Sequence, residues 1–154
     1  MKTLLRENSA RLSERRLTRR VEKSWRSCAQ ECLPSWGDIQ QLDLGEDWDL
    51  CFAIDLRLSN GFPYFVYLGD GLCRFSSIYL TGRARCEETL LDIATSKMDE
   101  AALSRGPVFY DNVLRLFNRR RIVFRSVLLP LSANGVDVTH VFGAANGKGG
   151  FTGC

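Results

Sequence analysis

The sequence predicts an α+β domain in which helices flank a five-stranded antiparallel sheet. One segment before residue 70 alternates apolar and polar residues and a second, at 62–68, is strand-like, and three further strand-like segments lie between residues 108 and 145. A segment with helical spacing separates the two groups. The chain has 154 residues, of which 45% are hydrophobic and 25% are charged. That length and balance are typical of one globular domain with its own core.

The N-terminal segment, residues 1–33, has the pattern of an amphipathic helix. Its apolar stripe consists of Leu17, Val21, Trp25, Cys28 and Cys32. Residues 1–26 hold nine Lys or Arg and three Glu, whereas the remainder of the chain is slightly acidic. The stripe should bury against the sheet of its own chain or against the same helix of a second chain. We expect the second arrangement, a homodimer, and a flexible tail at 148–154.

The first strand is expected at 48–56, where Leu50, Phe52, Ile54 and Leu56 share one face and Asp49 and Asp55 lie on the other. A polar linker, 38–47, precedes it, and a second strand at 62–68 follows the turn Ser59-Asn60-Gly61. Short helices are expected over 72–80. One longer helix is expected over 86–102, because its apolar residues recur at helical spacing.

Three strands should follow, at 108–117, 121–131 and 136–145, joined by turns at 118–120 and 133–135. Three-residue turns pair even with even residues, which places Asn112, Ser126 and His140 on one sheet face. These polar groups could satisfy one another or line a ligand pocket. The opposite face, which the N-terminal helix could cover, would hold Val113, Phe117, Val123, Val127 and Leu129.

Three stretches resemble the PAS domain family, and in particular the short single-domain PAS proteins of alphaproteobacteria. Residues 65–75 resemble the second PAS strand and the small helix after it, and Leu80-Thr81-Gly82-Arg83 resembles the motif before the long helix. Residues 125–132, with Gly135, Val136, His140 and Gly143, resemble the last hairpin. The resemblance spans roughly residues 34–147.

This resemblance implies a PAS fold and a sensing or interaction module rather than an enzyme. In the family a flanking N-terminal helix commonly supports dimerisation, and a ligand, when present, lies between the sheet and the small helices. The pocket residues expected here are Phe52, Ile54, Leu90, Asn112, Leu114, Phe124, Ser126, Leu128, His140 and Phe142.

No cofactor is the main expectation. Haem-binding PAS domains usually ligate iron through a histidine on the long helix, and His140 lies on the last strand instead. Cys73 stands near residues similar to a flavin motif but precedes Gly82-Arg83, so we interpret that similarity as coincidence. Cys28 and Cys32 would need two further ligands to hold a metal.

Composition and sequence pattern argue against several other classes of function. The sequence has no run of 18 apolar residues and no signal-peptide pattern at its start, so we expect a cytoplasmic protein with reduced cysteines and no membrane contact. The preferred hypothesis is a signalling module that contacts a partner protein and can take a small-molecule ligand. Weaker alternatives are a haem sensor, an enzyme using Cys51 and His140, and a nucleic-acid-binding regulator using the basic arm.

Overall fold

The computed structural model describes residues 16–80, 88–116 and 118–148. Its centre is a five-stranded antiparallel sheet in the order β2-β1-β5-β4-β3. The strands are β1 (Cys51–Asp55), β2 (Phe65–Leu68), β3 (Val108–Arg115), β4 (Arg121–Leu131) and β5 (His140–Lys148). The expected α+β class and the antiparallel sheet are confirmed.

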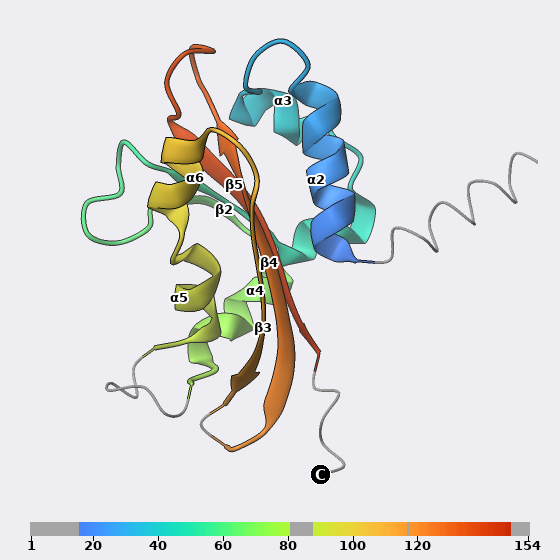
Figure 1. Ribbon diagram of the computed structural model, residues 1–154, viewed down its shortest axis with the longest axis vertical. Coiled ribbons are helices and arrows are strands. Elements are labelled where there is room, and N and C mark those ends of the chain that lie inside the picture. Colours follow the sequence, from blue (N-terminus) through green and yellow to red (C-terminus); the bar gives the residue numbers. More distant parts are fainter. Residues whose placement is uncertain (1–15, 81–87, 117, 149–154) are drawn as a thin grey trace, which may run out of the picture.

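Helices lie on both faces of this sheet (Figure 1). One face is covered by α2 (Leu17–Cys28), α3 (Trp36–Gln40) and the 3-10 helix η1 (Gly45–Leu50). The other face is covered by α4 (Asp70–Cys73), the 3-10 helix η2 (Arg74–Ser77), α5 (Leu90–Thr95) and α6 (Met98–Ser104). The sheet therefore has two separate cores, one on each face.

Successive side chains of strand β1 point to opposite faces of the sheet, so this strand contributes to both cores. Phe52 and Ile54 point towards the small helices, whereas Cys51 and Ala53 point towards α2. All five residues of β1 are buried, because the strand lies between β2 and β5 and is covered on both faces. The expected strand at 48–56 is thus found, but it begins later because residues 45–50 form η1. Strand β2 likewise begins at Phe65 rather than at residue 62.

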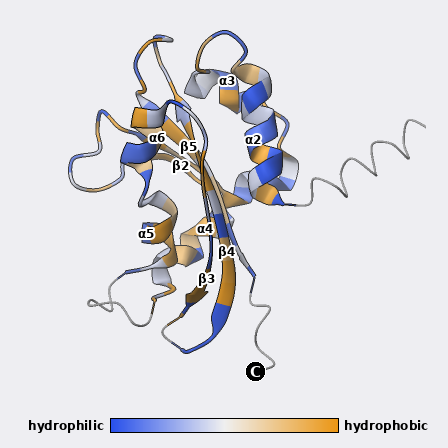
Figure 2. Cartoon of the chain, in the orientation of Figure 1, coloured by the Kyte–Doolittle hydropathy of each residue, from blue (hydrophilic) through white to orange (hydrophobic). Residues whose placement is uncertain are grey.

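The N-terminal helix packs against its own sheet. Leu17, Val21 and Trp25 are buried, and the Trp25 indole Nε1 donates a hydrogen bond of 3.0 Å to the Pro130 carbonyl oxygen of β4. Figure 2 shows that much of the remaining surface of α2 is hydrophilic. The apolar stripe expected to bind a second chain is therefore already buried within the single chain. The stripe is buried in this way because the sheet face under α2 is itself apolar, and the homodimer stays a prediction.

The stripe is also shorter than its spacing indicated. Helix α2 ends at Cys28, and Cys32 is exposed beyond it. Residues 38–47 are not a linker, because Ser35 and Asp38 form a capping box that begins α3. Two aromatic rings from α3 and η1 pack against one ring of β2 and one of β5 at this end of the sheet, with neighbouring centroids 5.4–6.3 Å apart. The rings belong to Trp36, Trp48, Tyr67 and Phe142.

On the opposite face the small helices α4 and η2 are found where short helices were expected, whereas residues 78–80 are extended and form bridges to Thr89 and Leu116. The expected single helix over 86–102 is wrong within the described part, since α5 and α6 are separate. Thr89 and Asp92 form a capping box that begins α5 only at Leu90. A break at Ser96–Lys97 then separates the two helices.

The pairing of β4 with β5 differs from the sequence expectation. β3 pairs with β4 even to even, as expected, but β4 pairs with β5 even to odd, with Leu128 opposite Gly143 and Leu131 opposite His140. The connection runs from Ser132 to Thr139 because the Asn134 side chain accepts hydrogen bonds from the backbone N–H groups of Val136 and Asp137. This turn delays β5 to His140, and the strand continues to Lys148, into the expected tail.

Candidate functional site

The space between the sheet and the small helices is filled by side chains. The Phe52 ring lies over Gly143, so closely that a Cβ on Gly143 would overlap the ring. Phe52, Leu72 and Phe124 are fully buried in this core. A small void beside Ser126 and Tyr110 has no room for a water molecule. Among the described residues, the region expected to hold a ligand is thus a packed core.

The ten expected pocket residues do not share one site. Six of them belong to this packed core: Phe52, Ile54, Leu90, Leu114, Phe124 and Leu128. Ser126 is buried on the same face, but Asn112 is exposed and its side-chain amide donates to the Tyr110 hydroxyl. His140 and Phe142 face α2, because the changed register of β5 turns them to the other side of the sheet. The expected cluster of Asn112, Ser126 and His140 is therefore not assembled.

The described residues do not fit a haem or a flavin in the space between the sheet and the small helices. Cys73 is exposed on α4, while its neighbours Leu72 and Phe75 fill the core. His140 lies on the opposite face of the sheet from the small helices. Within the described ranges, no group of three or more His, Cys, Asp or Glu side chains is placed to hold a metal ion, and Cys28 and Cys32 are not part of such a group.

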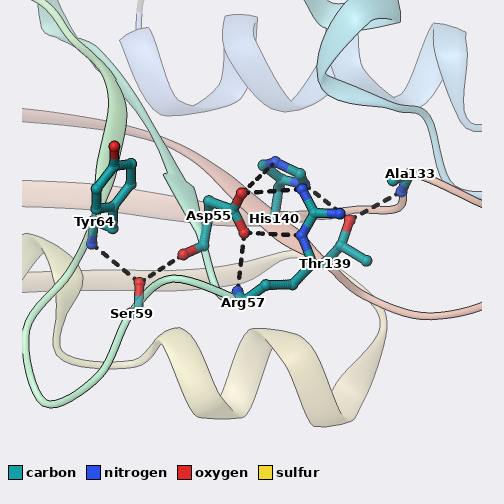
Figure 3. Close-up of polar contacts among 7 residues, drawn as sticks. All are labelled: Asp55, Arg57, Ser59, Tyr64, Ala133, Thr139 and His140. Atoms are coloured by element: carbon teal, nitrogen blue, oxygen red, sulfur yellow. Dashed lines mark hydrogen bonds and ion pairs between the residues drawn. The ribbon is translucent and has the colours of Figure 1, made fainter.

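The densest polar cluster lies instead where β1 ends and β5 begins (Figure 3). Asp55 and His140 are direct partners across the antiparallel pair, and both are buried. The Asp55 carboxylate accepts hydrogen bonds from the Arg57 backbone N–H (2.9 Å), from Arg57 Nε (3.1 Å) and from Arg57 Nη2 (3.0 Å). Its Oδ2 atom is also 3.5 Å from His140 Nε2. We refer to Asp55, Arg57, Thr139 and His140 as the Asp55 cluster.

The Thr139 hydroxyl links the β4–β5 connection to the His140 ring. The Thr139 hydroxyl oxygen accepts a hydrogen bond of 2.9 Å from the Ala133 N–H and lies 2.8 Å from His140 Nδ1. With the hydroxyl proton directed at Nδ1, the neutral ring holds its own proton on Nε2, which faces Asp55. The chain of contacts thus joins the β4–β5 connection, β5 and the end of β1.

The electrostatics keep Asp55 ionised and His140 neutral. The Arg57 guanidinium, with smaller contributions from its backbone N–H and from His140, lowers the pKa of Asp55 against the opposing effect of burial. Burial lowers the pKa of His140 and outweighs the opposing effect of the Asp55 charge, while Arg57 acts in the same direction as burial. The pair is therefore a buried carboxylate beside a neutral imidazole at pH 7.

This cluster anchors the connection between β1 and β2, residues 56–64. The Ser59 hydroxyl donates to the Asp55 carbonyl oxygen (2.7 Å) and accepts from the Tyr64 N–H (3.0 Å). The anchored segment holds three large apolar side chains out to solvent, with Phe62 83% exposed and Leu58 and Tyr64 at least half exposed. A groove of about 320 Å³ separates it from α6, with Leu56, Pro63 and Met98 in its walls. We call Leu58, Phe62, Tyr64 and this groove the loop surface.

The loop surface and the Asp55 cluster were missed by the sequence analysis. The signal for the cluster was the polar triplet Asp55, Thr139 and His140 within otherwise apolar strands, but the β5 register needed to pair them was wrong. The signal for the surface was Phe62 beside the turn Ser59–Gly61, where an exposed aromatic residue is unusual.

Similarity to known proteins is found among solved structures. The sequence matches no protein-family model and no curated protein. Among solved structures, it is similar to a fungal LOV-domain photoreceptor (19% identity, TM-score 0.41), covering 69% of this chain and 80% of that one. It is also similar to a light-oxygen-voltage domain studied with a flavin analogue (13%, TM-score 0.39), covering 64% and 76%. A PAS domain from a two-component sensor histidine kinase is a third (16%, TM-score 0.36), covering 64% and 83%.

The described part of the chain has an α+β fold. The five-stranded antiparallel sheet, the small helices on one face and the flanking N-terminal helix are the features that the sequence resemblance implied. None of the helices in the described ranges is long and apolar enough to span a membrane.

Proposed function

We propose that the protein is a PAS-type signalling module that acts by contacting a partner protein through the loop surface. The observation that supports this most is the exposure of Leu58, Phe62 and Tyr64 on a segment that the Asp55 cluster holds in place. Large apolar side chains gathered on an ordered surface are typical of a contact site, since leaving them in water is unfavourable.

The packed interior favours contact over ligand sensing as the main role. A small molecule between the sheet and the small helices would have to displace Phe52 or Phe124 from a close-packed core. Ligand binding there remains a secondary proposal, and an absorption spectrum and mass spectrum of the purified protein would test it together with haem and flavin.

A non-enzymatic role is also part of the proposal. Burial raises the pKa of the Cys51 thiol, so it stays protonated at neutral pH, and its Sγ donates to the Asp47 carbonyl oxygen instead of facing His140. A protonated buried thiol is a poor nucleophile. The cytoplasm is the location we propose from the sequence.

The loop surface, rather than the stripe of α2, is the contact we propose for any partner, including a second copy of the chain. Contact through the stripe would require Leu17, Val21 and Trp25 to leave the sheet. Nucleic-acid binding through the basic helix is a separate and weaker proposal, since the rest of the chain is mildly acidic.

Site-specific photocrosslinking tests the contact. A photoreactive phenylalanine analogue is placed at Phe62 in cells that make the protein, and at Val113 as the control, because Val113 is an exposed apolar residue on the other edge strand. The proposal predicts a discrete crosslinked species at position 62 that is absent at position 113 and is lost when Leu58→Asp is added. Equal or absent crosslinking at the two positions would contradict it.

A further inference from the structure

A basic cleft lies on the α2 side of the sheet, away from the Asp55 cluster and from the small helices. It has a volume of about 510 Å³ and opens between the start of α2 and the far ends of β4 and β5. In Figure 1 the two strands continue past the first turn of α2, and none of the described helices covers this part of the sheet face. The volume is within the range of small-molecule sites in proteins.

The sheet register explains why the cleft is polar. Under α2, β4 and β5 present Val127, Leu129 and Ala144. Beyond the helix the same face continues with Arg125 opposite Asn146 and with Val123 opposite Lys148. The apolar face thus ends where the helix ends, and basic residues replace it.

Four basic side chains line the cleft: Arg16, Arg20, Arg125 and Lys148. Within the part of the chain that the structure describes, its walls contain no acidic residue. Asp47 binds Arg20 through two hydrogen bonds of 2.8 and 3.0 Å and so fixes that guanidinium. Among the described residues, the carboxylates of Asp47 and Asp111 contact basic residues of the cleft, and the four basic side chains outnumber them.

Arg125 has hydrogen-bonding capacity that the protein does not use. Its Nε atom is buried without a hydrogen-bond partner, and the Asp111 carboxylate is 3.8 Å away, beyond hydrogen-bond distance. A buried cationic N–H without an acceptor is unfavourable, and an oxyanion in the cleft would supply one.

The first turn of α2 adds to the positive potential. Its N-cap residue, Arg16, provides no side-chain cap, and the turn contains no acidic residue. The N-terminus of a helix is the positive end of its dipole, so basic residues there repel it and an anion stabilises it. The walls also contain Leu17 and Leu50, which offer an apolar surface beside the charges.

From this arrangement we propose that the cleft binds a small molecule that carries phosphate together with an apolar or aromatic group, such as a nucleoside phosphate. Arg125 and Lys148 bind the phosphate oxygens, and Arg16 adds charge at the helix start. The apolar group rests on Leu17 and Leu50. This site is distinct from the loop surface and does not depend on the function proposed for it.

Calorimetric titration of the full chain tests the site, with inorganic phosphate, pyrophosphate and adenosine monophosphate as probes. The expected result is saturable 1:1 binding, tighter for the monophosphate nucleotide than for inorganic phosphate. Arg125→Gln with Lys148→Gln should weaken it at least about tenfold, because two charge-assisted contacts are lost. Arg16→Gln, an exposed position, should weaken it less and provides a variant with little risk to folding.

The matched control is Lys23→Gln with Arg74→Gln, which removes the same charge from two exposed positions that do not line the cleft. It should leave binding unchanged. No saturable binding by any probe, or equal weakening by the control and the cleft variant, would overturn the proposal. Binding of an oligonucleotide at lower concentration than the mononucleotide, lost in the cleft variant, would also overturn it and would assign the cleft to nucleic acid instead.

Discussion

The two faces of the sheet are both buried but in different ways. The face under the small helices is covered by segments within residues 70–80 and 88–104, together with Phe52, whose ring lies over Gly143. The face under α2 is covered by a helix near the start of the chain, held by three apolar side chains and the Trp25 hydrogen bond to Pro130. Among the described residues the first face is therefore a packed core, and the second leaves part of the sheet open as the basic cleft.

Apart from substitution of Trp25, the largest effect should come from the small-helix face. Gly143→Ala would place a methyl group against the Phe52 ring, and overpacking of a rigid ring between two strands should lower the free energy of unfolding by about 3 kcal/mol. Denaturant unfolding measures it. Phe52→Leu should restore much of that loss in the double variant.

Gly147→Ala is the matched control for that substitution, on the same strand. Its added Cβ would lie 2.9 Å from Ile122 Cδ1, the end of a flexible side chain that can move. If Gly147→Ala lowers the free energy of unfolding as much as Gly143→Ala does, the close contact between the Phe52 ring and Gly143 is not the cause of the loss.

The Asp55 cluster joins the α2 face to the loop surface, and its substitution should have an intermediate effect. Asp55→Asn replaces two charged acceptors by one neutral oxygen and an amide donor that faces Arg57 or His140. We expect a loss of about 1–2 kcal/mol in the free energy of unfolding and faster amide hydrogen exchange over residues 56–64. Asp43→Asn, at an exposed position, should change neither quantity.

The pH dependence of stability should follow from His140. Its pKa is lowered by burial from an ordinary value of 6.5, so below about pH 6.5 the unfolded chain binds a proton that the folded chain does not. Stability should therefore fall as the pH decreases from 6.5 towards the folded-state pKa. Unfolding midpoints at several pH values measure this, and His140→Gln should flatten the profile between pH 6.5 and 5. Asp55, with its lowered pKa, loses its contribution only below its ordinary value of 3.8.

The smallest effect on stability should come from the loop surface. Phe62→Ser removes an aromatic side chain that is already in water, so the free energy of unfolding should change by no more than about 0.5 kcal/mol. The same variant should lose partner contact. A large loss of stability would mean that Phe62 is structural, and the loop surface would no longer be a candidate contact site.

The sequence predicted the strands and the α2 stripe because both depend on local periodicity. Alternation placed Phe52 and Ile54 on one face, and the three- and four-residue spacing of Leu17, Val21 and Trp25 identified a helix with one buried side. The sequence did not identify what the stripe packs against, because the same apolar stripe could bury against the sheet of its own chain or against a second chain.

The site could not be predicted because it depends on one turn. The side-chain hydrogen bonds of Asn134 lengthen the β4–β5 connection. The longer connection pairs even residues of β4 with odd residues of β5, which turns His140 to the α2 face. A change of one residue in register moves every side chain of a strand to the other face. The expected pocket lost His140 and Phe142 for this reason, and the pairing of Asp55 with His140 could not be foreseen.

The central claim is that α2 belongs to the fold of its own chain rather than to a dimer contact. Sedimentation and denaturant unfolding of Trp25→Glu test it together, with Lys23→Glu on the exposed side of α2 as the control. The account predicts that Trp25→Glu severely destabilises the chain, by at least the roughly 3–5 kcal/mol typical of removing a buried tryptophan, at concentrations where the wild-type chain is monomeric. A variant that stays as stable as the control and only converts a wild-type dimer into a folded monomer would contradict it.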